Sequence, residues 1–211
     1  MNIKVFLIKH LIRKKIHENY SIISNDCWGG EFYQFHNLPY TSPFVGLMIM
    51  APDYIKLLSN LEYYLKQKIE FVKYSSYKKI NELLENEHFP LGLLGEVEIC
   101  FLHYKSEQEV IEKWNRRVQR INKKNIIVKF DGSKDYANKN LINQFIQLPF
   151  DNKFFFTKEK MNLSFELFIE KYNYNAKTLF YNSILEYDLY KLIYASKIKK
   201  HHKFNKVLAL K

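Results

Sequence analysis

The chain has 211 residues, of which 47% are hydrophobic, so it is long enough and apolar enough to bury the core of one domain. Its two cysteines exclude a disulfide framework and a cysteine-based zinc site and fit a reducing cytoplasm, and no stretch approaches the roughly 20 apolar residues that span a bilayer. We therefore expect a soluble cytoplasmic protein, whose formal net charge of +11 favours an anionic partner such as a phosphorylated sugar or an anionic membrane surface.

The N-terminal half is predicted to alternate between helices and strands. Apolar residues recur at helical spacing up to about residue 17, and Pro52 is a favourable first residue for a second long helix. Between these helices, a short strand leads into a polar loop with two glycines. The predicted elements are a helix over residues 1–17, strands at 20–24, 46–50 and 69–73, a short helix at 31–36 and a helix over 52–68.

The second half begins with an irregular stretch at 74–95 and then continues the alternation. A strand at 97–104 precedes a capping box at Ser106 and Glu109, which starts a helix that reaches residue 122. With a strand at 125–130, this predicts a strand–helix–strand unit with a right-handed crossover. A helix at 139–148 and a strand at 153–157 follow, and the pattern beyond Leu163 is helical and rich in tyrosine.

This order of elements predicts an α/β fold of three layers, with a mixed or mostly parallel sheet and Rossmann-like crossovers. We expect one α/β domain over residues 1–162. A helical C-terminal extension over residues 163–211 would pack on that domain and end in a basic tail.

The loop at residues 25–30 is the first candidate site, because ligands of open α/β sheets bind at the carboxyl ends of strands. Asn25 and Asp26 lie at the start of this loop, and Gly29 and Gly30 would let a ligand approach the backbone. Asp26 is a candidate general base or a partner for a sugar hydroxyl. The alternative is that both polar residues only form the turn.

Cys27 and His103 form a second hypothesis. A thiol just before a helix can have a lowered pKa and act as a nucleophile. His103 lies at the end of another predicted strand and would be the base if the two strands are neighbours. The alternative is that Cys27 is a small buried hydrophobic residue.

The helix that follows Ser106 carries a group of arginines. Arg116, Arg117 and Arg120 offer planar donor groups suited to phosphate, and Trp114 could stack on a base or a sugar. In the alternative, Trp114 lies in the core and the arginines pair with the acidic residues Glu96, Glu98 or Glu109.

Six short motifs between residues 20 and 160 resemble those of a bacterial family of unknown function. They are Asn25-x-Cys27-x-Gly29-Gly30, Ser42-Pro43, Phe89-Pro90-x-Gly92, Phe101-x-His103-Tyr104, Lys113-Trp114-x-Arg116-Arg117-x-x-Arg120-Ile121 and Phe145-x-x-Leu148-Pro149-x-x-x-Lys153. Members of this family are often labelled exopolysaccharide or capsule biosynthesis proteins. The resemblance implies an α/β fold and a cell-surface polysaccharide setting, and it supplies no reaction.

The sequence contains no Walker A loop, no Gly-x-Gly-x-x-Gly, no His-Glu-x-x-His and no Asp-x-Asp motif, and it lacks the signatures of nucleic-acid-binding modules. We therefore predict no cofactor, no metal and no nucleic-acid partner. The leading hypothesis is a glycosyl- or acyl-group transferase that binds a phosphorylated or nucleotide-activated sugar. The loop at 25–30 and His103 would form its reaction centre, the three arginines would hold phosphate, and Ser42 would help shape the pocket.

Two alternatives to this hypothesis stay open. One is a Cys27-dependent acyltransferase or hydrolase that acts on a glycan. The other is a non-enzymatic scaffold peripheral to the inner face of the membrane, where the basic segment at 191–211 would bind anionic lipid.

Overall fold

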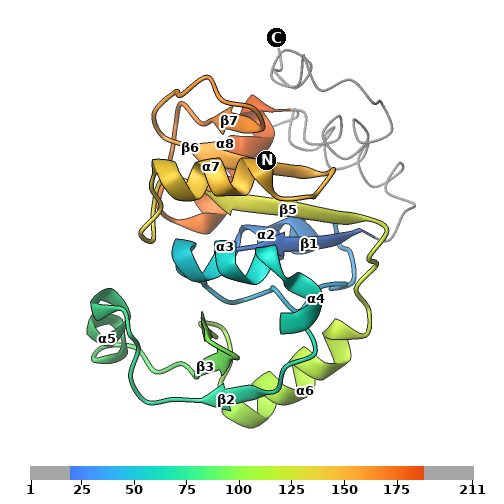
Figure 1. Ribbon diagram of the computed structural model, residues 1–211, viewed down its shortest axis with the longest axis vertical. Helices are drawn as coiled ribbons and strands as arrows, with labels where there is room; N and C mark the ends of the chain where they lie inside the picture. The colour runs from blue at the N-terminus through green and yellow to red at the C-terminus, as the bar shows by residue number, and fades with distance from the viewer. Residues whose placement is uncertain (1–19, 188–211) are drawn as a thin grey trace.

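The computed structural model describes residues 20–187, and its centre is a four-stranded parallel sheet (Figure 1). The strand order is β1-β5-β6-β7, with β1 at Ser21–Ser24, β5 at Ile126–Asp131, β6 at Lys153–Thr157 and β7 at Glu166–Phe168. The register places Ser21 beside Ile126 and Val128 beside Lys153. Both faces of β6 are buried, which explains its unbroken apolar run Phe154-Phe155-Phe156.

Helices cover both faces of this sheet, as Figure 1 shows, with α3 and α7 in front and α2 and α8 behind. Helices α3 (Ala51–Ser59) and α7 (Lys139–Gln147) share a core with Val128, Phe130 and Phe155. Helices α2 (Trp28–Phe35) and α8 (Ala176–Glu186) share another with Ile127 and Phe156. Successive strand residues point to opposite faces, so each strand contributes to both cores. The predicted three-layer α/β fold, including a helix near the C-terminus, is confirmed.

A second sheet is antiparallel, with the order β2-β3-β4. Its strands are β2 (Ile69–Phe71), β3 (Leu91–Leu94) and β4 (Val97–Cys100), and the short helices α4 (Leu61–Tyr64) and α5 (Lys78–Leu84) lie between α3 and β3 in the chain. Helix α6 (Glu107–Val118) follows β4, and its N-terminus is capped as predicted, because the Ser106 hydroxyl accepts a hydrogen bond from the Glu109 N–H at 3.2 Å.

The predicted strand–helix–strand unit over residues 97–130 is wrong. Strands β4 and β5 lie in different sheets, so α6 connects the two sheets and does not cross over within one. The reason is the turn at Gly95, whose φ of +63° lets β3 and β4 form a tight hairpin. The predicted strand ends at Cys100, because residues 102 and 103 form a turn.

Several other predicted bounds differ from the observed elements. The stretch at 46–50 makes only one bridge, from Met48 to Cys100, and the predicted helix at 52–68 is interrupted at Asn60. Strand β7 pairs with β6, so the boundary expected between residues 162 and 163 falls between two strands of one sheet. The helix predicted for residues 1–17 and the basic segment at 191–211 lie outside the described residues.

Candidate functional site

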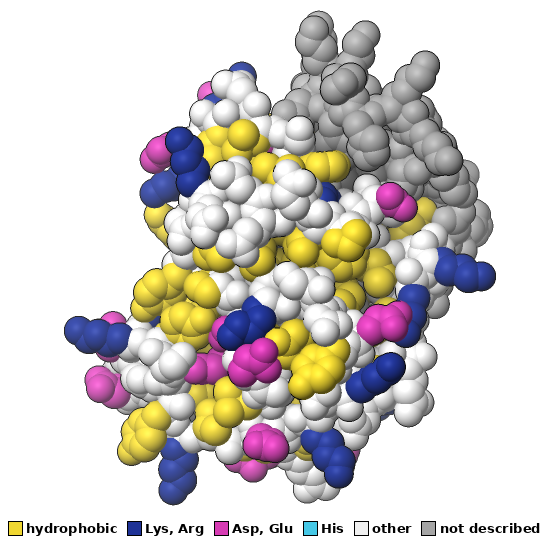
Figure 2. Space-filling view, viewed as in Figure 1, with side chains coloured by type: hydrophobic (Ala, Val, Ile, Leu, Met, Phe, Trp, Pro, Cys, Tyr) yellow, Lys and Arg dark blue, Asp and Glu magenta, His cyan; other side chains and the backbone are white. Residues whose placement is uncertain are grey.

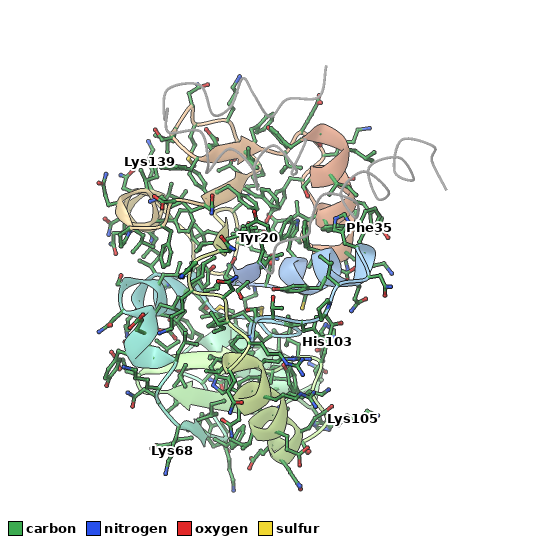
Figure 3. The ribbon with its side chains drawn as sticks, turned by 90° about the vertical axis from the view of Figure 1, so that its right-hand side faces the viewer. Tyr20, Phe35, Lys68, His103, Lys105 and Lys139 are labelled. Atoms are coloured by element: carbon green, nitrogen blue, oxygen red, sulfur yellow. The ribbon has the colours of Figure 1, made fainter. Side chains whose placement is uncertain are left out.

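An open pocket of about 260 Å³ lies beside helix α2. Its walls come from three separate parts of the chain: α2 and the residue before it, the loop that follows α2, and the stretch from the end of β4 into α6. Figure 3 shows the labelled His103 between α2 and α6. The lining residues are Cys27, Gly30, Glu31, Gln34, Tyr40, Val45, Gly46, His103, Tyr104, Lys113 and Arg117.

Gly46 allows two walls of this pocket to meet. Its φ is +74°, which favours glycine, and a Cβ at this position would lie 3.2 Å from the Cβ of His103. The His103 N–H donates to the Gly46 carbonyl at 3.0 Å, and the Tyr104 hydroxyl donates to the Val45 carbonyl at 2.8 Å. The loop after α2 is therefore fixed to the end of the second sheet.

Arg117 is the most unusual residue of the pocket, because its side chain is buried with no acidic partner among residues 20–187. The residue is 6% exposed, and its Nη1 donates to the Tyr104 hydroxyl at 2.6 Å. The guanidinium carbon lies 4.8 Å from the centre of the Tyr40 ring. Among residues 20–187, no carboxylate forms an ion pair with it. Arginine cannot release its proton, so this buried charge is suited to an anionic ligand.

The other candidates on and just after α6 lie apart from this pocket. Arg116 and Arg120 are exposed and do not line it. Trp114 is buried in the core, edge-on to Phe44 and Phe101 with ring centres 5.5 Å and 6.2 Å away. Of the four residues singled out on the predicted helix, the structure therefore places only Arg117 at the pocket.

Cys27 and His103 do line the same pocket, as their hypothesis requires. The Cys27 thiol contacts the Leu47 carbonyl, with Sγ 3.8 Å from the oxygen. Burial and the neighbouring Asp26 carboxylate raise the pKa of this thiol to about 12. A thiol in this state is protonated at neutral pH, which is unfavourable for a nucleophile.

A buried group of charges, which we call the switch cluster, lies at the carboxyl ends of β1 and β5. The Lys129 Nζ lies 2.7 Å from Asp26 Oδ2 and 3.8 Å from Asp131 Oδ2, and the Lys134 Nζ lies 3.0 Å and 3.6 Å from the same two atoms. The Tyr172 hydroxyl donates to Asp131 Oδ1 at 2.8 Å. The chain leaves β1 for one face of the sheet and β5 for the other. Such a topological switch point, after which we name the cluster, is where open α/β sheets commonly bind ligands.

Electrostatics keep Asp26 charged and engaged. Burial acts to raise its pKa, but the ammonium groups of Lys129 and Lys134 outweigh burial and hold the pKa far below its usual range. Its Oδ1 also accepts from the Trp28 N–H at 3.1 Å and the Ser24 hydroxyl at 2.8 Å, which fixes the start of α2. For Asp131, burial is the larger effect, and its pKa is raised.

The remaining candidates of this region support the same local structure. The Asn25 Oδ1 accepts from the Asp131 N–H at 2.9 Å. A Cβ on Gly29 would lie 3.2 Å from Ile22 Cγ2, so this glycine lets α2 pack closely on β1, whereas Gly30 faces the pocket. Ser42 is buried in the loop after α2, where its hydroxyl accepts from the Phe44 N–H at 3.2 Å.

Comparison with known proteins places the chain in a family. Residues 2–201 match the family described as "Domain of unknown function (DUF1919)". The chain belongs to the DUF1919 family. It is also similar to an "Uncharacterized protein" of Haemophilus influenzae, with 33% identity over 154 residues that cover 73% of this chain and 69% of the relative. Membership of a family of unknown function is thus established, and neither description names an activity.

Two further observations on this DUF1919 chain concern membrane-spanning helices and metal sites. Between residues 20 and 187, no helix combines the length and apolar character needed to cross a bilayer. Within the same range, no three His, Cys, Asp or Glu side chains are grouped so that they could hold a metal ion.

Sequence reasoning missed seven lining residues of the pocket: Glu31, Gln34, Tyr40, Val45, Gly46, Tyr104 and Lys113. Tyr104 and Lys113 lie inside motifs already quoted. Glu31 and Gln34 would have been found if the helix had been started at residue 28, because positions 27, 30, 31 and 34 then share one helical face.

Proposed function

We propose that this protein is a transferase of cell-surface polysaccharide synthesis that binds a phosphorylated sugar in the pocket between α2 and α6. The observation that carries this proposal is Arg117, which is buried at the pocket wall without a carboxylate partner among the described residues. Arginine donates to two phosphate oxygens at once, and burial strengthens such bonds. The polysaccharide setting is supported by the resemblance of the six motifs to proteins with that label.

The same pocket holds groups that could serve a glycosyl transfer. An acceptor hydroxyl oxygen would bond to the anomeric carbon of the sugar while the bond from that carbon to the phosphate oxygen breaks. His103 would take the proton of the acceptor hydroxyl, and Arg117 would stabilise the phosphate that leaves. His103 is exposed and can therefore meet an acceptor that arrives from solvent.

This route is favoured over a Cys27-dependent acyl transfer. Both need the pocket, but acyl transfer needs a thiolate, and the pKa of Cys27 is raised to about 12. Glycosyl transfer needs no charge on that thiol.

The proposal is tested by thermal unfolding of the full chain in the presence of phosphorylated sugars. A ligand at about 100 times its dissociation constant should stabilise the fold by roughly 2.7 kcal/mol. Arg117→Met should weaken binding by roughly 10- to 100-fold, since a hydrogen bond to a charged group contributes about 1.5–3 kcal/mol. Arg116→Met is the matched control, because Arg116 lies on the same helix but is exposed. If no phosphorylated sugar raises the melting temperature, the proposal fails.

A further inference from the structure

The pocket carries an inference about the size of its ligand, which rests on the proposed function. Pockets for drug-sized ligands have volumes of about 300–1,000 Å³. This pocket, at about 260 Å³, is smaller. It suits a single sugar ring with one phosphate better than a nucleotide sugar, which adds a base, a ribose and a second phosphate.

The aromatic rings of the pocket point to the same conclusion. A nucleotide base is commonly held against a ring face or an apolar slot. The face of Tyr40 carries the Arg117 guanidinium, and the Lys113 Nζ lies over Tyr104, 5.3 Å from the ring centre. Tyr40 also meets Tyr33 edge-on, with ring centres 5.6 Å apart. The faces of Tyr40 and Tyr104 thus already hold cations, and Trp114 is buried. All three rings are therefore unfavourable partners for a nucleotide base.

The wall formed by α2 is polar and acidic. Glu31 and Gln34 are one helical turn apart and line the pocket from the same face of α2. Glu31 is partly buried and Gln34 is exposed, and in the part of the chain that the structure describes no side-chain hydrogen bond or ion pair engages either group. A carboxylate and an amide are suited to sugar hydroxyls, and the carboxylate repels phosphate.

We infer that the pocket binds a monosaccharide phosphate, not a nucleotide sugar, with the phosphate at Arg117 and the sugar hydroxyls at Glu31 and Gln34. The two ends of the ligand are distinguished by charge, so its orientation is fixed. Glu31 and Gln34 then decide which sugar is bound, and Arg117 holds any phosphate.

Isothermal titration of the full chain tests this with hexose 1-phosphate, hexose 6-phosphate, inorganic phosphate, UDP and UDP-hexose as probes. At least one hexose phosphate should bind about 10-fold or more tightly than inorganic phosphate, since each sugar hydrogen bond adds about 1 kcal/mol. UDP and UDP-hexose should bind more weakly than that hexose phosphate. Glu31→Gln and Gln34→Ala should each weaken hexose phosphate by about 5- to 10-fold and change inorganic phosphate by less than about 2-fold.

The outcomes separate this inference from the proposed function. If UDP-hexose binds more tightly than any hexose phosphate and the binding depends on Arg117, the monosaccharide inference is overturned while the proposed function stands. If Glu31→Gln and Gln34→Ala leave hexose phosphate binding unchanged, the assigned orientation is wrong. If no probe binds, the proposed function fails first.

Discussion

At the scale of single residues, the molecule buries an unusual amount of charge. Lys129 and Asp131 are both 0% exposed, and Asp26 is 3% exposed. Burying such charges is costly unless they are paired, and the switch cluster pairs each carboxylate with two ammonium groups. Asp26 also fixes the start of α2, so the charges that stabilise the sheet edge also position the pocket wall.

Replacing Lys129 by Met should therefore be strongly destabilising. The change removes the closest partner of Asp26 and leaves that carboxylate with Lys134 alone. We expect a loss of about 3–5 kcal/mol in the free energy of unfolding, measured with urea. Lys123→Met is the control, because the Lys123–Glu62 pair is exposed to solvent and should contribute little to stability. Equal losses in the two variants would contradict the role of the switch cluster.

The depressed pKa of Asp26 predicts the pH dependence of stability. Its folded pKa lies below its unfolded pKa of about 3.9, so its contribution is complete above that pH and is lost as the pH falls towards the folded value. The raised pKa of Asp131 acts in the opposite direction, since its protonation favours the folded state. Comparison with Asp26→Asn isolates the first effect. The difference in unfolding free energy between the two proteins should be constant above about pH 5 and shrink below about pH 4; a difference that grows on acidification would contradict this assignment.

The raised pKa of Cys27 predicts slow alkylation. At pH 8, iodoacetamide should label Cys27 and Cys100 slowly and at similar rates, because burial raises the pKa of both thiols to about 12. Labelling in urea, where both thiols have ordinary pKa values, gives the reference rate. In a separate assay, the Cys27→Ser variant should keep the transferase activity of the unaltered protein. Rapid labelling of Cys27 alone in the folded protein would instead favour acyl transfer.

At the scale of elements, the sequence predicts those whose signals are local. The unbroken apolar run of β6 and the capping box of α6 identify these elements directly. The partition of strands into two sheets is not local, because β1 pairs with β5 across about a hundred residues of chain. Strand β7 was missed because three residues are too few to show the alternation of apolar and polar residues that marks a strand. It is recognised only by its pairing with β6.

In the candidate site, too, the sequence predicts what depends on local signals and misses what depends on contacts between distant segments. Loop 25–30 and the residues Cys27, Gly30, His103 and Arg117 were predicted, and the pocket brings the last four together. Which of three neighbouring arginines would face inward could not be read from the sequence, because that depends on Tyr104 and Tyr40, which come from distant segments. The pairing of Asp26 with Lys129 has the same cause, since the two residues meet only when β1 and β5 align.

Gly46 links the fold of these elements to the pocket. Gly46→Ala should cost about 1–2 kcal/mol, since φ is positive there, and should also weaken ligand binding, because the new Cβ displaces His103. Gly95→Ala is the matched control: its φ is also positive, but its Cβ would meet the Tyr64 ring at 3.5 Å and Gln67 Cγ at 4.0 Å, and neither residue lines the pocket. Urea unfolding and titration with hexose phosphate should show similar losses of stability in both variants and a loss of binding only in Gly46→Ala. Unchanged binding in Gly46→Ala would contradict the role of this contact.

At the scale of the whole molecule, the pocket lies where two substructures meet. Helix α2 belongs to the layers of the parallel sheet, whereas Tyr104 and α6 follow the antiparallel sheet. One core spans both, because α3 packs against β4 as well as α7. On the face shown in Figure 2, basic and acidic side chains are interspersed, so the net charge of +11 is not gathered there into one basic surface. The local charge at Arg117 is therefore more informative than the total.

The proposed role of Arg117, which is to hold the phosphate of a sugar ligand, is tested most directly by titration calorimetry of three proteins. The unaltered protein, Arg117→Met and Arg116→Met would each be titrated with the hexose phosphate that the unaltered protein binds most tightly, after circular dichroism has shown that all three are folded. We expect Arg116→Met to match the unaltered protein and Arg117→Met to bind roughly 10- to 100-fold more weakly. Equal affinities in Arg117→Met and the unaltered protein would contradict this role.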